Sequence, residues 1–246
     1  MTRYRPVTSY AFKFLVIGAG RGGTSLLAGL LDAHSQLEVG FERFSAAYLM
    51  GTGLPLDFTT TPATLAQDRA QLFRSACCAE AARHPQKLWG DKITTEHLGA
   101  LREQPGINTL DLFFNRVMPD IKIIFILRDG RTCVRSKVTR TGQEVGTAIE
   151  RWRYSVEVWR WLGGLKHRVH RLRYEDLVTH PTPVLKAVCA FLHIPFESEI
   201  LQGTNSDKMR PEYRAHGMRY DGLSVGPELN AIAAQLEPEL RECGYL

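Results

Sequence analysis

The feature that most limits the possible folds is a glycine-rich loop near the start of the chain, GAGRGGTS at residues 18–25. The apolar run FKFLVI precedes it at residues 12–17, and leucines at helical spacing follow it within residues 24–33. A short apolar run that stops at glycine predicts a buried strand, and the leucine stripe predicts an amphipathic helix. In such a corner the backbone N–H groups and the helix N-terminus form a concave site for an anion.

Further strands and helices alternate along the chain. Residues 121–127 (IKIIFIL) predict a second buried strand, and residues 170–174 (HRLRY) are a candidate third strand. Helices are expected at 63–84, directly after Asp129-Gly130, from Val145 to the Gly163-Gly164 pair, at 183–192 and at 230–243, with a loop at 51–62. This alternation predicts an α/β fold, with a mostly parallel sheet flanked by helices. No linker composition interrupts the chain, so residues 1–246 are predicted to form one domain.

The positive charge of the chain is concentrated in one window. The whole sequence has 31 Lys and Arg against 26 Asp and Glu, a formal net charge of +5. Residues 121–140 hold six basic residues and one acid, so this window contains the whole excess. A local excess is typical of a small polyanion site. A nucleic-acid-binding module, the non-enzymatic alternative, spreads its basic residues along an exposed face. We therefore expect a small anionic partner and no nucleic acid.

Several classes of protein are excluded by the patterns that the sequence lacks. No run of about 18 apolar residues is present, so no transmembrane helix is encoded. The first apolar run leads into the glycine loop without a signal-peptide cleavage pattern. The five cysteines are odd in number and contain no CxxC pair, which argues against a disulfide framework and a zinc site. These features predict a cytoplasmic protein without a bound metal.

The glycine spacing fits a dinucleotide fold in part. Gly18, Gly20 and Gly23 satisfy GxGxxG, and Glu38 follows at the distance of the acid that binds a ribose. This pattern leaves the basic window at 121–140 unexplained. A flavin or nicotinamide oxidoreductase is therefore the alternative enzyme, beside the plainer possibility that the glycines form only a tight packing turn.

A Walker phosphate-binding loop shares the GxxxxG spacing but continues with lysine. Here Thr24 stands in the lysine position before Ser25, so the charge that would hold the outer phosphates of ATP or GTP is missing. In a third interpretation Arg21 supplies the cation, and the hydroxyls of Thr24 and Ser25 donate hydrogen bonds to a phosphate–sulfate group.

Two motifs resemble those of the sulfotransferases that use 3′-phosphoadenosine 5′-phosphosulfate (PAPS). RGGTS at residues 21–25 resembles the loop that holds the 5′-phosphosulfate, which implies donor contacts from Arg21, Gly22, Gly23, Thr24 and Ser25. Residues 123–136 (IIFILRDGRTCVRS) resemble the strand and helix in which an arginine and a serine, here Arg128 and Ser136, hold the 3′-phosphate. Arginine suits that role because its guanidinium can bind a phosphate through two hydrogen bonds. The resemblance implies PAPS as donor and a P-loop NTPase-like sheet.

Within this family the tyrosylprotein sulfotransferase branch is the most similar, and the similarity runs almost end to end. The segments that carry it are LDAH (31–34), GFE (40–42), LRDGR (127–131), RYEDL (173–177) and CGY (243–245). The chain resembles a soluble, bacterial-type member of this branch.

The resemblance also assigns the remaining site residues. Glu42 corresponds to the general base that removes the acceptor proton. Arg21 and Lys92 correspond to the catalytic cations beside the transferring group. The further nucleotide contacts that it implies are Arg140, Tyr174, Ser206 and Arg219. Cations take the place of a metal ion in this chemistry, so none is expected.

The acceptor and some roles stay open. Phe44 and Tyr48 stand where a peptide enzyme would carry arginines for an acidic peptide. Peptide tyrosine, sugar, lipid and natural-product hydroxyls are therefore all candidates, each with release of adenosine 3′,5′-bisphosphate. Lys92 can also be an ordinary ion-pair partner of a neighbouring acid, Asp91 or Glu96. The acidic pair at 175–176 is expected to cap the helix that follows it.

Overall fold

The computed structural model describes residues 12–52, 62–102, 106–209, 218 and 227–246. Its centre is a five-stranded sheet with the strand order β2-β3-β1-β4-β5, in which every neighbouring pair is parallel. The strands are β1 (Phe12–Ile17), β2 (Leu37–Phe41), β3 (Leu88–Lys92), β4 (Lys122–Leu127) and β5 (Val169–Arg173). The predicted α/β fold with a parallel sheet is confirmed.

Two strands that the sequence analysis missed, β2 and β3, carry little of the usual strand signal. β2 reads LEVGF and β3 reads LWGDK, so each contains a glycine and charged side chains. Their pairing compensates for this composition. Gly40 lies opposite Asp91 and Phe41 opposite Lys92, while β1 pairs with the other edge of β3. The strand state of these segments therefore depends on their neighbours.

Helices cover the sheet on both sides. The first half of the chain contributes α1 (Thr24–Asp32), α2 (Pro62–Ala81), α3 (Thr95–Arg102) and two π-helical turns, η1 (Ser45–Leu49) and η2 (Asp111–Val117). The second half contributes α4 (Gly130–Thr141), α5 (Val145–Leu162), α6 (Tyr174–Thr179), α7 (Pro181–Leu192), the 3-10 segment η3 (Ser198–Asn205) and α9 (Pro227–Glu242).

Each expected helix is present, with ends that differ by a few residues. The helix expected at 63–84 ends at Ala81, because the residues that follow form tight turns back to it. Tyr174, expected as the last residue of the third strand, instead opens α6. Most of the loop expected at 51–62 lies outside the described residues.

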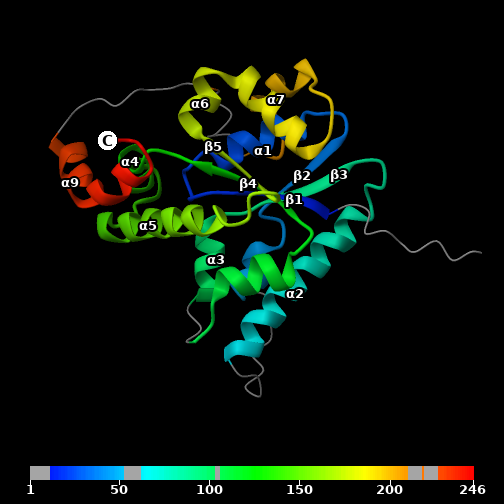
Figure 1. The fold of residues 1–246 in the computed structure, drawn as a ribbon, viewed down its shortest axis with the longest axis horizontal. Coiled ribbons are helices and arrows are strands. Elements are labelled where there is room, and N and C mark those ends of the chain that lie inside the picture. Colours follow the sequence, from blue (N-terminus) through cyan, green and yellow to red (C-terminus); the bar gives the residue numbers. More distant parts are fainter. Residues whose placement is uncertain (1–11, 53–61, 103–105, 210–217, 219–226) are drawn as a thin grey trace, which may run out of the picture.

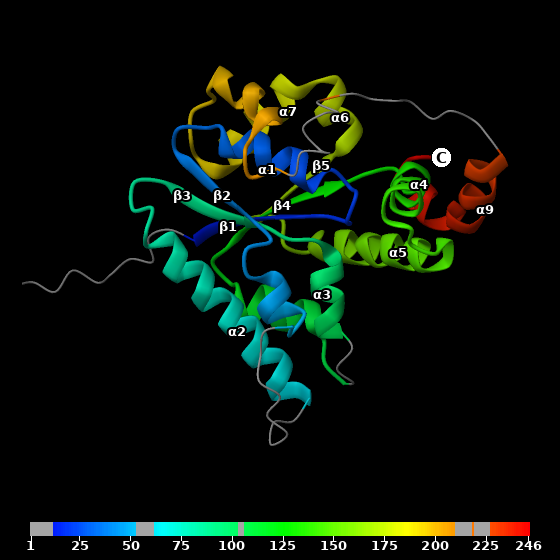
Figure 2. The same ribbon diagram turned by 180° about the vertical axis from the view of Figure 1, so that it is seen from behind.

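The core forms two layers on opposite faces of the sheet, which Figures 1 and 2 show from opposite sides. On one face, Phe14 and Val16 of β1 pack with apolar side chains of α1 and α7. On the other face, Leu15 and Ile17 of the same strand pack with α2, α3 and α5. Successive residues of β1 are thus buried on both sides, which explains the continuous apolar run at residues 14–17.

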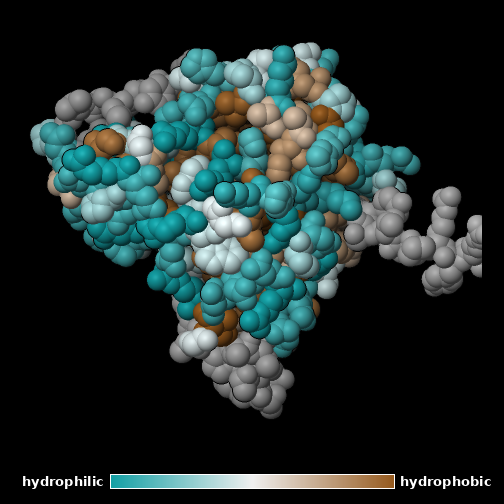
Figure 3. Space-filling view, viewed as in Figure 1, coloured by the Kyte–Doolittle hydropathy of each residue, from teal (hydrophilic) through white to brown (hydrophobic). Residues whose placement is uncertain are grey.

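The face of the molecule in Figure 3 is largely hydrophilic. In Figure 3 most side chains are teal, and the brown residues form separate patches. The large hydrophobic side chains that are exposed among the described residues are Met50, Leu72, Val145 and Leu246. None of the described helices combines the length and hydropathy of a membrane span.

The parallel sheet places the carboxyl ends of all five strands at one edge. There the chain passes from β1 into the glycine loop, from β4 into α4 and from β5 into α6. In open α/β folds ligands bind at this edge. Most of the expected site residues are carried by these corners and by the ends of β2 and β3.

Candidate active site

The glycine loop turns sharply between β1 and α1. Arg21 and Gly23 both have positive φ, 67° and 96°, and the N–H of Gly22 donates to the carbonyl oxygen of Ala19 at 2.8 Å. Gly23 has no room for a side chain, since a Cβ there would lie 2.4 Å from Cδ2 of Tyr174. As the N-cap of α1 it also offers no side-chain acceptor. Backbone donors at the start of α1 are therefore left for an anion.

An ion pair between helices α3 and α4 also contacts the glycine loop, through the backbone N–H of Gly20. The N–H of Gly20 donates to both carboxylate oxygens of Glu96 in α3, at 2.9 and 3.1 Å, and Glu96 pairs with Lys137 of α4. Burial acts to raise the pKa of Glu96, but the Lys137 ammonium and the backbone N–H outweigh it, so this pKa lies below its usual value. The pair is not apparent from the sequence, because its members are 41 residues apart.

A cavity of about 450 Å³ opens in front of the loop. Ten expected site residues line it: Arg21, Gly23, Thr24, Ser25, Glu42, Lys92, Arg128, Ser136, Arg140 and Tyr174. Its other wall residues are Gly20, Leu26, Phe41, Thr94, Thr132, Arg135, Thr139, Lys208 and Met209. The described wall holds six cationic side chains and a single carboxylate, so the cavity favours anions.

Three expected residues are not part of the described wall. Gly22 lies within the loop without lining the cavity. Ser206 follows η3, and its hydroxyl accepts the N–H of Lys208, a wall residue, at 3.3 Å. Arg219 lies outside the described residues. Donor contacts from Ser206 and Arg219 stay predictions.

The ends of β2 and β3 bring Glu42 and Lys92 together. Lys92 Nζ lies 2.6 Å from Glu42 Oε1, and the N–H of Glu42 donates to the carbonyl oxygen of Lys92 at 2.8 Å. The Lys92 side chain is 6% exposed and that of Glu42 is 33% exposed. Glu42 has φ of 58°, a conformation that costs energy for a non-glycine residue and is common at functional sites. The salt-bridge partner of Lys92 is therefore Glu42, and not Asp91 or Glu96.

Asp91 lies beneath this pair and is fully buried. Its Oδ1 accepts the N–H of Lys92 at 3.0 Å, and the backbone N–H of Arg43 acts to lower the pKa of its carboxyl. Oδ2 has no hydrogen-bond partner among the described residues, and burial raises the pKa of Asp91 to about 7. Gly40 makes room for this carboxylate, since a Cβ there would lie 2.6 Å from Oδ1. The sequence indicates Asp91 only as a possible ion-pair partner of Lys92. The hydrogen bond from the Lys92 N–H to the Asp91 carboxylate is not apparent from it.

Arg128 is held at the other side of the cavity by three contacts. Its Nη1 donates to the carbonyl oxygen of Arg21 at 3.0 Å, and its Nε donates to Thr132 Oγ1 at 3.1 Å. Its guanidinium carbon lies 4.5 Å from the centroid of the Tyr174 ring. Arg21 Nε in turn donates to Ser136 Oγ at 3.2 Å. The glycine loop and the β4–α4 corner are thus joined directly.

Comparison with known proteins identifies the family. The description "Sulfotransferase family" belongs to a family profile that matches residues 14–198, most of the chain. The chain belongs to the sulfotransferase family. The predicted membership is therefore confirmed.

Curated relatives of this sulfotransferase include protein-tyrosine sulfotransferases. The Drosophila melanogaster enzyme is 27% identical over 206 residues, which covers 75% of this chain and 38% of that protein. Protein-tyrosine sulfotransferase 2 of Gallus gallus is 22% identical over 197 residues, which covers 75% of this chain and 52% of that protein. The chain thus spans about half the length of these relatives, or less.

Solved sulfotransferase structures share the fold. The sulfotransferase domain of the Synechococcus PCC 7002 olefin synthase has a TM-score of 0.61 and 20% identity, covering 96% of this chain and 98% of that chain. The domain from the curacin biosynthetic pathway has a TM-score of 0.58 and 20% identity, covering 92% and 98%. A mouse sulfotransferase complexed with PAP has a TM-score of 0.53 and 13% identity, covering 95% and 86%. The predicted α/β sulfotransferase fold is confirmed.

The acid required by the dinucleotide alternative is engaged elsewhere. Glu38 Oε2 lies 3.0 Å from Lys87 Nζ, and its other oxygen pairs with Lys208. Glu38 is not part of the cavity wall. Within the described part of the chain, no group of three or more His, Cys, Asp or Glu side chains is placed to hold a metal ion.

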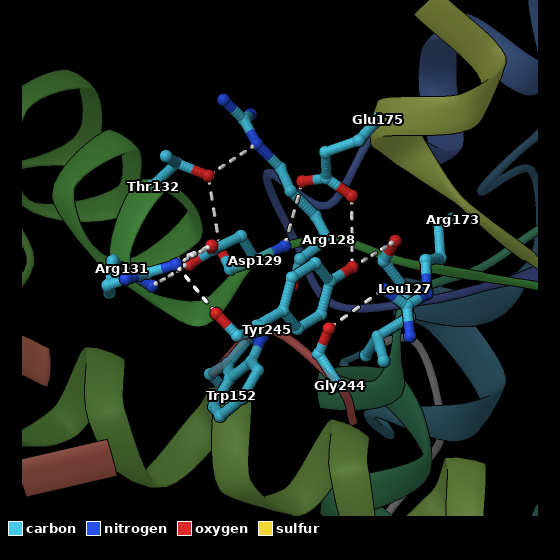
Figure 4. Close-up of polar contacts among 10 residues, drawn as sticks. All are labelled: Leu127, Arg128, Asp129, Arg131, Thr132, Trp152, Arg173, Glu175, Gly244 and Tyr245. Carbon is cyan, nitrogen blue, oxygen red and sulfur yellow. Dashed lines mark hydrogen bonds and ion pairs between the residues drawn. The ribbon is translucent and has the colours of Figure 1, made fainter. Parts of the chain in front are cut away.

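The expectation that the acidic pair at 175–176 caps the following helix is wrong for its first member. No side-chain hydrogen bond caps α6 at its N-cap residue. The Glu175 carboxylate instead accepts the N–H of Asp129 and the hydroxyl of Tyr245, as Figure 4 shows. These long-range donors compete successfully with the free N–H groups of a helix that is only six residues long.

Proposed function

We propose that this sulfotransferase transfers the sulfuryl group of PAPS to an acceptor hydroxyl and releases adenosine 3′,5′-bisphosphate. One observation carries the proposal: Arg21 and Arg128 are joined in a cationic cavity in which Glu42, the one carboxylate of the described wall, pairs with Lys92. A donor with phosphate groups at two positions needs two sets of cationic ligands. The fold-related mouse sulfotransferase is described as a complex with PAP, which supports the same class of nucleotide here.

The two ends of the donor have matching groups in the cavity. For the 5′-phosphosulfate these are the Arg21 guanidinium, the hydroxyls of Thr24 and Ser25, and the backbone N–H of Gly23. The N–H of Gly22 is already bound to the carbonyl oxygen of Ala19, so Gly22 contributes to the turn of the loop. For the 3′-phosphate and the nucleoside they are Arg128, Ser136, Arg140 and Tyr174. Fixed cationic donors of this kind bind phosphate groups strongly in a partly enclosed site.

The transfer itself is an in-line displacement at sulfur. The acceptor oxygen forms a bond to sulfur while the bond from sulfur to the bridging phosphate oxygen breaks. The acceptor proton goes to the Glu42 carboxylate, which acts as general base. Negative charge grows on the departing phosphate, where Arg21 and Lys92 supply fixed positive charge.

The Glu42–Lys92 ion pair supports these roles. Lys92 is nearly buried, so few conformations are open to its side chain. It therefore holds Glu42 Oε1 at the end of β2, beside the cavity. When the donor is bound, the same ammonium lies within reach of the transferring group, so base and cation act on one reacting centre.

The acceptor is a compound with a hydroxyl group. Phe41 lies in the wall next to Glu42 in sequence, with its ring centroid 5.8 Å from Lys92 Nζ. Phe44 and Tyr48 pack against each other, with ring centroids 6.5 Å apart, and against the core. They thus offer no positive charge to an acidic peptide. This favours an acceptor with an uncharged body over an acidic tyrosine peptide.

The cysteines support a reducing compartment. All five are free thiols, and unpaired cysteines are usual where disulfides do not persist. We therefore propose the cytoplasm as the place of action.

Calorimetric titration with adenosine 3′,5′-bisphosphate tests the donor site. We expect binding by the wild type and at least about tenfold weaker binding by Arg128→Ala and Ser136→Ala, each of which loses a phosphate ligand. Arg151→Ala removes an exposed arginine of α5 that does not line the cavity, and is the matched control. No binding at high micromolar concentration, or equal binding by all four proteins, refutes the proposal. Stabilisation by NAD(H) and not by the bisphosphate would favour the oxidoreductase alternative.

A further inference from the structure

The segment that follows α9 returns to the carboxyl edge of the sheet, where Figure 4 shows Tyr245 beside Leu127 and Arg173, the last residues of β4 and β5. Gly244 has φ of 68° and its N–H donates to the carbonyl oxygen of Arg241 at 3.0 Å. The N–H of Tyr245 donates to the carbonyl oxygen of Leu240 at 2.8 Å. These two bonds form a Schellman cap. A Cβ at Gly244 would lie 2.8 Å from Arg173 Nη2, so the end of α9 fixes where Tyr245 lies.

Tyr245 connects the ends of β4 and β5. Its hydroxyl donates to Glu175 Oε2 at 2.9 Å and lies 3.4 Å from the carbonyl oxygen of Leu127. The guanidinium carbon of Arg173 lies 4.8 Å from the ring centroid, and Arg131 Nη2 donates to the carbonyl oxygen of Tyr245 at 3.2 Å. Burial, with the nearby Glu175 carboxylate, raises the pKa of the Tyr245 hydroxyl. The hydroxyl therefore remains a hydrogen-bond donor at neutral pH.

Glu175, which accepts the Tyr245 hydroxyl, also binds the backbone next to Arg128. Glu175 Oε1 accepts the N–H of Asp129 at 3.0 Å, and the carbonyl oxygen of Arg128 accepts Trp152 Nε1 at 3.0 Å. Both polar groups of the peptide unit between Arg128 and Asp129 are thus bound. Glu175 also follows Tyr174, whose ring lies against the Arg128 guanidinium. One carboxylate therefore fixes the position of Arg128 relative to Tyr174.

We propose that Tyr245 is a positioning residue for the donor nucleotide. Its hydroxyl orients the Glu175 carboxylate, which holds Arg128 in the direction from which it binds the 3′-phosphate. The inference rests on the proposed function, because it requires Arg128 to be a donor ligand. Tyr245 itself does not line the cavity, so its loss affects binding of the 3′-phosphate and leaves the rest of the nucleotide site intact.

The test compares two nucleotides that differ only in the 3′-phosphate. Tyr245→Phe removes the hydroxyl alone. We expect it to bind adenosine 3′,5′-bisphosphate about tenfold more weakly than the wild type, and adenosine 5′-monophosphate equally well. Tyr154→Phe is the matched control, because Tyr154 is buried, whereas Tyr245 is half-buried, and the Tyr154 hydroxyl has no hydrogen-bond partner among the described residues. Calorimetry is expected to show wild-type affinity of Tyr154→Phe for both nucleotides.

The outcomes separate this inference from the function on which it rests. A wild type that binds both nucleotides equally refutes the assignment of Arg128 to the 3′-phosphate. If the wild type prefers the bisphosphate and Tyr245→Phe keeps the full preference, only the positioning role fails. If Tyr245 has a purely structural role, Tyr245→Phe binds both nucleotides more weakly by the same factor. This result also overturns the inference. Glu175→Gln is expected to weaken bisphosphate binding, and the double variant to weaken it no further, because both residues act through one contact.

Discussion

Lys92 Nζ lies 2.6 Å from Glu42 Oε1, although the two residues are 50 positions apart in the chain. The contact exists because β2 and β3 are parallel neighbours in which Phe41 lies opposite Lys92. The next residue after β2, Glu42, therefore lies one position beyond Lys92, where its N–H donates to the Lys92 carbonyl oxygen. Sheet register, and not a long loop, brings the proposed base and the proposed cation together.

Removing the charge of Lys92 is expected to slow the reaction more than it weakens donor binding. Lys92→Met keeps the length of the side chain but no longer balances charge on the departing phosphate, so kcat is expected to fall about 10²–10³-fold. Steady-state kinetics with varied PAPS measures the separate effects on kcat and KM. Lys87→Met, just before β3, removes a lysine that pairs with Glu38 outside the cavity, and we expect near-normal kcat. A Lys92→Met enzyme with wild-type kcat is incompatible with the proposed role.

Asp91→Asn is expected to change how stability depends on pH. The pKa of this buried carboxyl is about 7 in the folded protein, whereas an unfolded chain releases the proton near pH 4. Between these values the folded protein binds the additional proton, so through this group the free energy of unfolding falls as pH rises from about 4 to 7. Relative to the wild type, the asparagine variant therefore gains stability across that window, by roughly 4 kcal/mol.

Urea unfolding of the wild type and Asp91→Asn at pH 5 and pH 8 measures this difference. Asp68→Asn changes an exposed carboxylate of α2 and serves as control. If the stability difference between Asp91→Asn and the wild type is the same at both pH values, the carboxyl does not titrate with a raised pKa.

The Glu96–Lys137 pair behind the glycine loop is expected to be strongly coupled. Its side chains are 16% and 4% exposed, so Glu96→Gln or Lys137→Met alone leaves an uncompensated buried charge and costs roughly 3–5 kcal/mol. The double variant recovers part of that loss. As a surface comparison, Glu237→Gln breaks an exposed i,i+4 pair and is expected to cost less than about 1 kcal/mol. Additive effects of the two buried substitutions in urea unfolding would show that the pair does not act as a unit.

Alanine substitutions at two glycines with positive φ, Gly142 and Gly23, distinguish the cost of a left-handed backbone from the cost of a steric clash. At Gly142, the C-cap of α4, φ is 66° and a Cβ would meet nothing within 4 Å. Gly142→Ala is therefore expected to cost only the left-handed conformation, about 1–2 kcal/mol. Gly23→Ala adds the clash with Tyr174, so it is expected to be less stable and also to lose affinity for adenosine 3′,5′-bisphosphate. Thermal unfolding and calorimetry of both variants measure the two effects, and an equal, small loss in both would contradict the tight packing at Gly23.

The sequence predicts some strands better than others for a physical reason. β1 and β4 are buried on both faces, and burial leaves a continuous apolar run that is easy to recognise. β2 and β3 end at the site, so they carry Gly40, Asp91 and Lys92 in place of such a run. Residue patterns therefore predict the anion loop and the basic window, while the roles of Glu42 and Lys92 follow from the resemblance to a family.

The contacts that support the site could not be predicted from local patterns. Glu96 meets Gly20 across 76 residues, and Tyr245 meets Glu175 across 70. Each of these residues looks ordinary in its own segment, and only the packing of α3 and α9 brings it to the edge of the sheet. The capping role expected for the acidic pair at 175–176 is wrong for the same reason. The carboxylate of Glu175 accepts hydrogen bonds from the Tyr245 hydroxyl and the Asp129 N–H, which are distant in the sequence.

In the proposed reaction Glu42 removes the acceptor proton during transfer from PAPS. The transfer of radioactive sulfur from labelled PAPS to phenol, sugar, lipid-alcohol and peptide-tyrosine hydroxyls tests this role. We expect the wild type to label at least one class, and Glu42→Gln to bind adenosine 3′,5′-bisphosphate normally but to transfer at least about 100-fold more slowly. Glu38→Gln changes a carboxylate of the same strand that does not line the cavity, and is expected to transfer near the normal rate. Transfer by Glu42→Gln at the wild-type rate, or label left wholly on the donor with every acceptor class, would contradict this role.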